Sequence, residues 1–137
     1  MEAKVEWVSG MTFKGVQDGH ELTMDLPLDA GGQNKGPKPK TLLLIALGGC
    51  TGLDVVSILE KMHVELDGFE MRLSAEQTDT HPKVFKNIHV TYIFFGQHLV
   101  KDQLLRAVSL SQERYCGVTA MLAKACPITY EIRVNPS

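Results

Sequence analysis

The chain has few cysteines and no recognisable leader segment. Cys50, Cys116 and Cys126 are the only cysteines among 137 residues, and so low and odd a count argues against a disulfide-stapled secreted fold. The segment Met1–Trp7 has no basic stretch followed by an apolar run, which a secretory leader would show. We therefore expect a reduced protein of the cytoplasm.

Long apolar runs and clusters of basic residues are also absent. The longest apolar run, Leu42–Leu47, is shorter than the roughly 20 residues that cross a bilayer, and two glycines follow it. The 14 Lys and Arg residues are scattered, and the formal net charge is −2. A nucleic-acid-binding protein would instead gather its basic residues on one face. We therefore expect neither a membrane nor a nucleic acid as a partner.

Motifs for phosphate binding, metalloproteases and serine hydrolases do not occur in the sequence. Gly48, Gly49 and Gly52 surround Cys50, but their spacing matches neither Gly-x-Gly-x-x-Gly nor a Walker motif. No two of the five histidines have the spacing of metal ligands on a helix. Only convergence of the three cysteines in space would supply a zinc site. We expect no metal and no cofactor.

The composition is that of one globular domain over residues 1–137. The 44% of hydrophobic and 22% of charged residues are ordinary values, and a chain of this size can bury an adequate core. Periodicity and turn residues predict strands at 5–8, 12–16 and 21–25, a loop over 27–39, a helix over 40–62, strands at 68–77 and 86–95, helices over 101–116 and 118–124, and a strand at 127–134. The strands cluster instead of alternating with helices, so the predicted fold class is α+β.

The helix predicted over residues 40–62 is apolar nearly all the way round. Such a helix belongs inside a protein, and a domain of this size rarely encloses one alone. We therefore expect a homodimer that closes over it. Gly48 and Gly49 each cost about 1 kcal/mol in a helix interior. Close packing of another backbone against them would explain their presence.

Cys50 lies on a polar stripe of this otherwise apolar helix. A free cysteine is most often a small core residue. Here, however, Asp54, Ser57 and Lys61 follow at intervals that place them on the same face as Cys50. An interface pocket reached by solvent would satisfy these polar groups. We expect Asp54 to be paired with a lysine or a backbone amide, and any cation that activates Cys50 must come from another segment.

The segments around two cysteines resemble the OsmC/Ohr superfamily, and in particular its generic OsmC-like branch. Residues 37–59 contain Gly-Gly-Cys-Thr-Gly-x-Asp-Val around Cys50, and residues 110–122 contain Cys116. Residues 81–92 look like the middle hairpin of the family. The resemblance spans nearly the whole chain. It implies an OsmC-like fold, in which antiparallel sheets wrap around two central helices in an intertwined homodimer.

The resemblance also implies thiol-dependent reduction of organic hydroperoxides in defence against oxidative stress. In the catalytic members the first cysteine is peroxidatic, which corresponds to Cys50, and the second is resolving, which corresponds to Cys116. A sulfenic acid beside a second thiol condenses readily to a disulfide, which a dithiol reductant then reduces. Cys126 has no counterpart in this scheme, and we expect it to be structural.

Two residues that activate the peroxidatic cysteine in catalytic members are missing. Those members supply an arginine from the N-terminal half and a glutamate ten residues before the cysteine. Here Lys40 occupies the latter position, and no arginine precedes Arg72. Lys35, Lys38 or Lys40 could supply the charge, although a lysine lacks the planar fork of an arginine.

Other interpretations of the cysteines stay open on these grounds. Arg114, two residues before Cys116, could replace the missing cation, but we expect it to be solvated near the end of its helix. The alternative function is a dimeric OsmC-like module that binds an apolar small molecule without peroxidase activity. A third possibility is a purely structural role for both cysteines.

Overall fold

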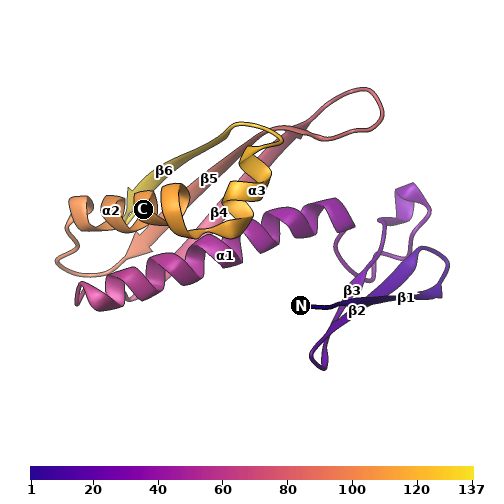
Figure 1. Ribbon diagram of the computed structural model, residues 1–137, viewed down its shortest axis with the longest axis horizontal. Helices are drawn as coiled ribbons and strands as arrows, with labels where there is room; N and C mark the ends of the chain where they lie inside the picture. The colour runs from indigo at the N-terminus through magenta and orange to yellow at the C-terminus, as the bar shows by residue number, and fades with distance from the viewer. The chain divides into compact units, whose positions relative to one another are not determined.

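The computed structural model describes every residue from Met1 to Ser137. The chain divides into two compact units, Met1–Leu43 and Leu44–Ser137. Each unit contains a three-stranded sheet (Figure 1). The long helix α1, Pro39–Lys61, begins in the first unit and continues in the second. A single domain over residues 1–137 stays a prediction.

The first unit is built on an antiparallel sheet in the order β1 (Lys4–Ser9), β2 (Thr12–Gln17) and β3 (His20–Met24). Asp18 and Gly19 connect β2 to β3 with φ angles of 49° and 78°. Positive φ at both central residues is what a two-residue type I′ hairpin requires. The predicted strands are therefore confirmed to within one residue at each end.

A buried carboxylate organises the loop predicted after β3. Asp25, which is 1% exposed, accepts hydrogen bonds from the hydroxyl of Thr12 at 2.8 Å and from the backbone amides of Leu26 at 2.7 Å, Lys35 at 3.3 Å and Gln33 at 3.4 Å. Burial opposes ionisation of Asp25, but these hydrogen bonds outweigh it and lower its pKa. The loop also contains a short 3-10 helix, η1 (Leu28–Ala30), which the sequence did not predict.

The sheet of the second unit contains one parallel pair. β4 (Gly68–Gln77) pairs antiparallel with β5 (Phe85–Phe95), whereas β6 (Ile128–Val134) pairs with β5 in parallel. A parallel neighbour needs a long crossover connection. The helical segment between β5 and β6 supplies it (Figure 1). The expectation of purely antiparallel sheets is therefore wrong for this pair.

The crossover is a chain of three helices rather than the two predicted. It consists of α2 (Lys101–Leu110), the π-helix η2 (Ser111–Tyr115) and α3 (Gly117–Ala123). The predicted helix over 101–116 is therefore interrupted at Ser111. Leu104 and Val108 of α2 are buried, whereas Leu105 is 44% exposed.

The core of the second unit lies between its helices and one face of its sheet. Alternate residues of β5 point to this face, and α1 and α2 cover it. The buried members of the cluster include Leu47, Val55 and Leu59 of α1, Ile88, Val90, Tyr92 and Phe94 of β5, and Leu104, Ala107 and Val108 of α2. The opposite face carries charged side chains, such as the ion pair of Arg133 and Glu131 at 2.8 Å.

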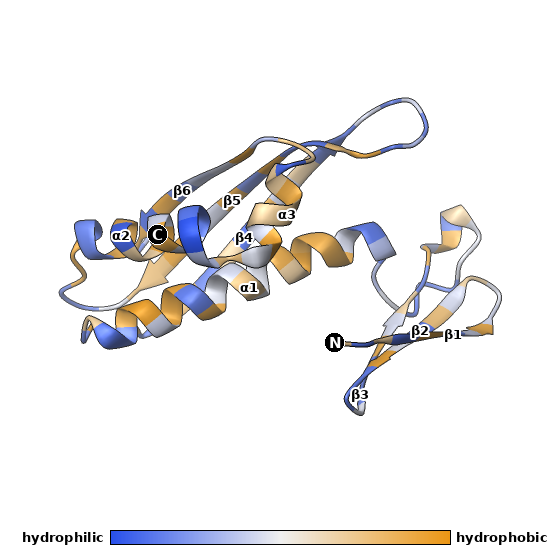
Figure 2. Ribbon diagram, in the orientation of Figure 1, coloured by the Kyte–Doolittle hydropathy of each residue, from blue (hydrophilic) through white to orange (hydrophobic).

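Helix α1 confirms the predicted span but is not buried all round within one chain. Leu43, Ile45, Leu53 and Val56 are between 45% and 75% exposed, and Figure 2 shows hydrophobic residues along the helix. The run Leu42–Leu47 is short, but α1 as a whole has the length and composition of a helix that crosses a membrane. The core helix of a soluble protein has the same length and composition.

The glycines of α1 admit side chains from the neighbouring strand β4. A Cβ atom on Gly48 would lie 2.9 Å from Cδ1 of Leu73, and one on Gly52 would lie 2.7 Å from Cε of Met71. Nothing lies within 4 Å of the same position on Gly49. The expected approach of another backbone is therefore wrong within the chain: side chains pack at Gly48, and Gly49 faces open space.

Candidate functional site

The second unit brings the thiols of Cys50 and Cys116 together. Cys50 is half-buried on α1, and Cys116 is 3% exposed at the start of α3. Both are free thiols. Burial raises the pKa of the Cys116 thiol, Thr119 opposes this rise, and the neighbouring Cys50 adds to it. The two sulfur atoms are thus close enough to interact, although they come from elements far apart in sequence.

Backbone hydrogen bonds on both sides hold Cys116 in place. Its own amide donates to the carbonyl oxygen of Ser111 at 2.9 Å, which closes the π-helical turn. Its sulfur accepts a hydrogen bond from the amide of Thr119 at 3.3 Å, so Cys116 is the N-cap residue of α3. A π-helical turn of this kind is rare and often marks a functional site.

A chain of polar side chains runs through the core beside the thiols. Gln112 donates from Nε2 to the hydroxyl of Tyr92 at 2.6 Å. The Tyr92 hydroxyl lies 2.7 Å from Oγ1 of Thr51, which lies 2.8 Å from Oγ of Ser111. Ser111 in turn donates to Oδ2 of Asp54 at 2.8 Å. Thr51, Ser111 and Tyr92 are fully buried, so every link lies in or at the edge of the core.

The carboxylate of Asp54 determines the direction of this chain. An ionised carboxylate only accepts, and each hydroxyl has a single hydrogen to donate. Ser111 gives its hydrogen to Asp54, so Thr51 must donate to Ser111, and Tyr92 must donate to Thr51. Tyr92 then accepts from Gln112. Each hydroxyl therefore donates once and accepts once, which is how a buried polar network becomes stabilising.

Tyr92 connects the polar chain to the thiol pair. Burial is the main cause of its raised pKa, and the charge of Cys116 adds to the rise. Sequence reasoning did not single out Tyr92 or Thr51. A threonine directly after Cys50, inside an apolar helix, was the available signal, because a polar side chain in that setting needs a buried partner.

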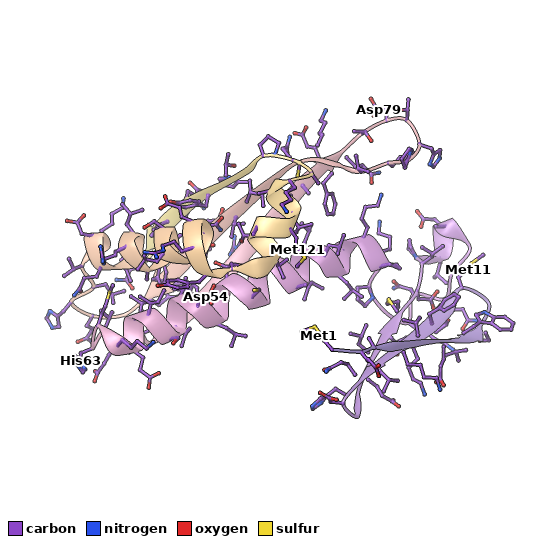
Figure 3. The ribbon with its side chains drawn as sticks, in the orientation of Figure 1. Met1, Met11, Asp54, His63, Asp79 and Met121 are labelled. Carbon is purple, nitrogen blue, oxygen red and sulfur yellow. The ribbon has the colours of Figure 1, made fainter.

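The polar stripe of α1 opens onto a groove. Asp54, Ser57 and Lys61 line a space of about 500 Å³, together with Ile58, Leu110 and Tyr115. The common face predicted for the stripe is confirmed for these three residues, whereas Cys50 is not among the residues that line the groove. Figure 3 shows Asp54 on the side of α1 that faces α2. The expected partner of Asp54, a lysine or a backbone amide, is wrong, since the structure gives it the hydroxyl of Ser111.

The other residues considered from the sequence lie outside the thiol pair. Arg114 is exposed, with its guanidinium carbon 5.9 Å from the centroid of the Tyr115 ring, which agrees with the expected solvated position. Cys126 is 6% exposed and packs in the hydrophobic core. No group of three or more His, Cys, Asp or Glu side chains is placed to hold a metal ion.

Comparison with known proteins identifies relatives that match over nearly the full length. The model of the OsmC-like protein family matches residues 32–131. Protein YhfA of Escherichia coli K12 is 39% identical over 135 residues, which is 98% of each chain. The crystal structure of a hypothetical protein from Aquifex aeolicus VF5 is 31% identical, covers 98% of this chain and 97% of its own, and gives a TM-score of 0.82.

A more distant structure shares the fold. The organic hydroperoxide resistance protein OhrB of Bacillus subtilis is 19% identical and gives a TM-score of 0.66, over 97% of this chain and 98% of its own. At this identity the likeness concerns the fold alone. The predicted α+β, OsmC-like fold and the resemblance to the generic OsmC-like branch are both confirmed. By the match of the family model and by its full-length identity with YhfA, the chain belongs to the OsmC-like protein family.

Proposed function

We propose that this protein reduces organic hydroperoxides in defence against oxidative stress, with Cys50 as the peroxidatic and Cys116 as the resolving cysteine. The observation that carries the proposal is the pair of neighbouring free thiols, of which Cys50 is partly accessible and Cys116 is buried. Membership of the OsmC-like family supports a peroxide-related role. So does the shared fold with an organic hydroperoxide resistance protein.

In the first step the Cys50 thiolate attacks the terminal oxygen of the hydroperoxide. The sulfur–oxygen bond forms as the oxygen–oxygen bond breaks, and the leaving alkoxide takes up a proton to give an alcohol. Sulfur is oxidised to sulfenic acid and the peroxide is reduced. The accessible position of Cys50 suits this step, because the substrate must reach the sulfur.

In the second step the Cys116 thiolate attacks the sulfenic sulfur of Cys50. The disulfide bond forms, and the departing hydroxide combines with the proton released by Cys116 to give water. A dithiol reductant then restores both thiols and is itself oxidised to a disulfide. Three free thiols in one chain fit the reducing cytoplasm, which we propose as the location.

We also propose that the protein works as a homodimer. The sheet of the first unit has one charged face, where Lys14 pairs with Glu6 and Glu21. Its opposite face carries Val5, Trp7, Phe13 and Leu22, which are between 39% and 67% exposed. Leu53 and Val56 of α1 are also exposed, and large apolar side chains gathered on one exposed face are typical of a surface that a protein partner covers.

The dimer can be tested by sedimentation equilibrium at micromolar concentration. We expect a mass near twice the 15.1 kDa of one chain. Substituting Leu53, which is 75% exposed on α1, with lysine should shift the mass toward one chain. A mass of one chain for the unaltered protein would refute the dimer.

Peroxidase activity can be tested with cumene hydroperoxide, a dithiol and a set of matched cysteine variants. We expect Cys50→Ser to lose peroxide consumption, and Cys116→Ser to accumulate Cys50 sulfenic acid without forming a disulfide. Cys126→Ser is the control and should keep the activity, because Cys126 packs in the hydrophobic core and has no part in the proposed steps. If the unaltered protein consumes peroxide no faster than Cys50→Ser, the proposed activity is refuted.

The same assay should identify the activating cation. Parallel variants Lys35→Ala, Lys38→Ala and Lys40→Ala test the three candidate lysines, and Arg114→Ala tests the arginine two residues before Cys116. We expect one of the lysine variants to slow the first step, since a thiolate needs a positive neighbour. Arg114→Ala should leave the rate unchanged, because Arg114 faces Tyr115 in solvent.

A second candidate function is the binding of an apolar small molecule without peroxide chemistry. An apolar groove of about 420 Å³ in the first unit favours it; Val5, Met11, Phe13 and Met24 are among its lining residues. Binding of a fluorescent apolar probe, lost in Phe13→Asp, would support this function. It becomes the better proposal if binding is found and the cysteine variants show no loss of peroxide consumption.

A further inference from the structure

The hydroxyl of Thr119 is a buried polar group without a hydrogen-bond partner. Thr119 is 4% exposed, and its Oγ1 is the one buried side-chain nitrogen or oxygen atom that lacks a partner. Buried hydroxyls are normally paired, because leaving one unpaired costs free energy. Each exception in a native protein therefore asks for an explanation.

Thr119 is placed to serve the sulfur of Cys116. It is the third residue of α3, counted from the N-cap Cys116, and its amide donates to the Cys116 sulfur at 3.3 Å. Thr119 is therefore one turn of helix away from the Cys116 side chain, on the same side of the helix start. The side chain of Thr119 opposes the rise that burial causes in the pKa of Cys116, and its amide already contacts the same sulfur. A neutral thiol is a weak acceptor, whereas a thiolate accepts strongly.

We propose that Thr119 is the group that stabilises the thiolate of Cys116, with its amide and its hydroxyl as two donors to the same sulfur atom. The hydroxyl is unpaired while Cys116 carries its proton, and it gains a partner when the thiol ionises. The role of this thiolate in disulfide formation rests on the proposed function, but the stabilisation of the thiolate does not.

The surroundings of Cys116 leave Thr119 as the available hydroxyl donor. The titratable groups that face Cys116 are Cys50 from α1 and Tyr92 from β5. Cys50 disfavours the charge on Cys116. The single hydroxyl hydrogen of Tyr92 is engaged by Thr51, in the direction imposed by Asp54. A buried thiolate at this position therefore depends on Thr119.

Stabilising the thiolate would speed the resolving step. Cys116 releases its proton, its thiolate displaces hydroxide from the sulfenic sulfur of Cys50, and the hydroxide takes up a proton to give water. Because burial opposes the charge on Cys116, the thiolate fraction limits this reaction. Loss of one hydrogen bond to a charged group should slow it by about tenfold or more.

The first experiment titrates Cys116 as the only thiol. In the Cys50→Ser, Cys126→Ser background, the ultraviolet absorbance of the thiolate gives the pKa of Cys116 with Thr119, Thr119→Val or Thr119→Ser. We expect Thr119→Val to raise the pKa, and Thr119→Ser to restore the original titration. An unchanged titration in Thr119→Val, or one in Thr119→Ser equal to that of Thr119→Val, would overturn the proposal.

A measurement of stability separates this role from packing. Valine has nearly the shape of threonine and removes an unpaired buried hydroxyl, so Thr119→Val should fold as well as the unaltered protein or better. A packing role predicts the opposite: loss of stability with no change in titration. That result would also overturn the proposal.

The second experiment follows both steps in the protein with all three cysteines. After one equivalent of cumene hydroperoxide, sulfenic acid is trapped by a dimedone-type reagent and disulfide is followed by the loss of free thiols. We expect Thr119→Val to slow disulfide formation about tenfold without changing the oxidation of Cys50. Equal slowing of both steps contradicts the assignment. If Cys50 is not oxidised at all, the proposed peroxidase function fails, and the titration alone decides the role of Thr119.

Discussion

Removing the hydroxyl of Thr51 should destabilise the protein more than any other exchange of threonine for valine in the chain. Thr51 links Tyr92 to Ser111, and all three side chains are fully buried. In Thr51→Val the hydroxyl hydrogen of Tyr92 loses its acceptor and the oxygen of Ser111 loses its donor. Each buried group left without a partner costs about 1–3 kcal/mol. We therefore expect a loss of about 2–4 kcal/mol in the free energy of unfolding.

Urea unfolding followed by circular dichroism measures this loss. The midpoint should fall while the slope stays constant, since a small protein with an unchanged native state exposes the same surface. Thr41→Val is the matched control, because Thr41 lies on the same helix but is exposed. Its effect should stay within about 0.5 kcal/mol. A loss below about 1 kcal/mol in Thr51→Val would refute the continuous buried chain.

A double-mutant cycle tests the link between Thr51 and Tyr92 directly. Tyr92→Phe alone leaves Thr51 without its donor and Gln112 without its acceptor. In Thr51→Val combined with Tyr92→Phe, neither partner of the 2.7 Å contact remains unpaired. The double variant should therefore lose less stability than the sum of the single variants, by about 0.5 kcal/mol or more. Strict additivity would show that the two hydroxyls are not coupled.

Three further predictions concern other parts of the chain. Asp25 has a lowered pKa in the folded state, so its contribution to stability is present at neutral pH and fades as the pH falls below about 4. Thermal melts at several pH values should show a smaller loss in Asp25→Asn than in the unaltered protein, and equal losses would contradict this role. Gly49→Ala should raise stability by about 1 kcal/mol in urea unfolding, because nothing lies within 4 Å of its Cβ position. Gly48→Ala should gain less than Gly49→Ala, because its Cβ would lie 2.9 Å from Cδ1 of Leu73 and that side chain must shift; a larger gain at Gly48 than at Gly49 would contradict the packing described. Cys126→Ala should lower the free energy of unfolding by about 1 kcal/mol, measured in urea, and leave peroxide consumption unchanged. A loss of activity in this variant would show that Cys126 takes part in the reaction.

Local periodicity accounts for most of the fold that the sequence could predict. The three N-terminal strands, the helix Pro39–Lys61 and the strands β4 and β5 follow from alternation, helical spacing and turn residues. These signals depend on neighbours in the sequence, so they survive without tertiary information. The π-helix after Ser111 and the parallel pairing of β6 do not have such signals, because both depend on contacts with distant segments.

The sequence by itself determined the family and singled out Cys50 and Cys116, since the residues around both thiols are specific to OsmC-like proteins. Only the tertiary structure brought these thiols together and gave Asp54 its partner Ser111, 57 residues away. Thr51 and Tyr92 likewise meet across 41 residues, and no spacing along the chain encodes such a contact. That the hydroxyl of Thr119 lacks a hydrogen-bond partner also depends on the positions of all its neighbours in the fold. A hydrogen-bond partner is a property of packing, and packing joins residues that the sequence keeps apart.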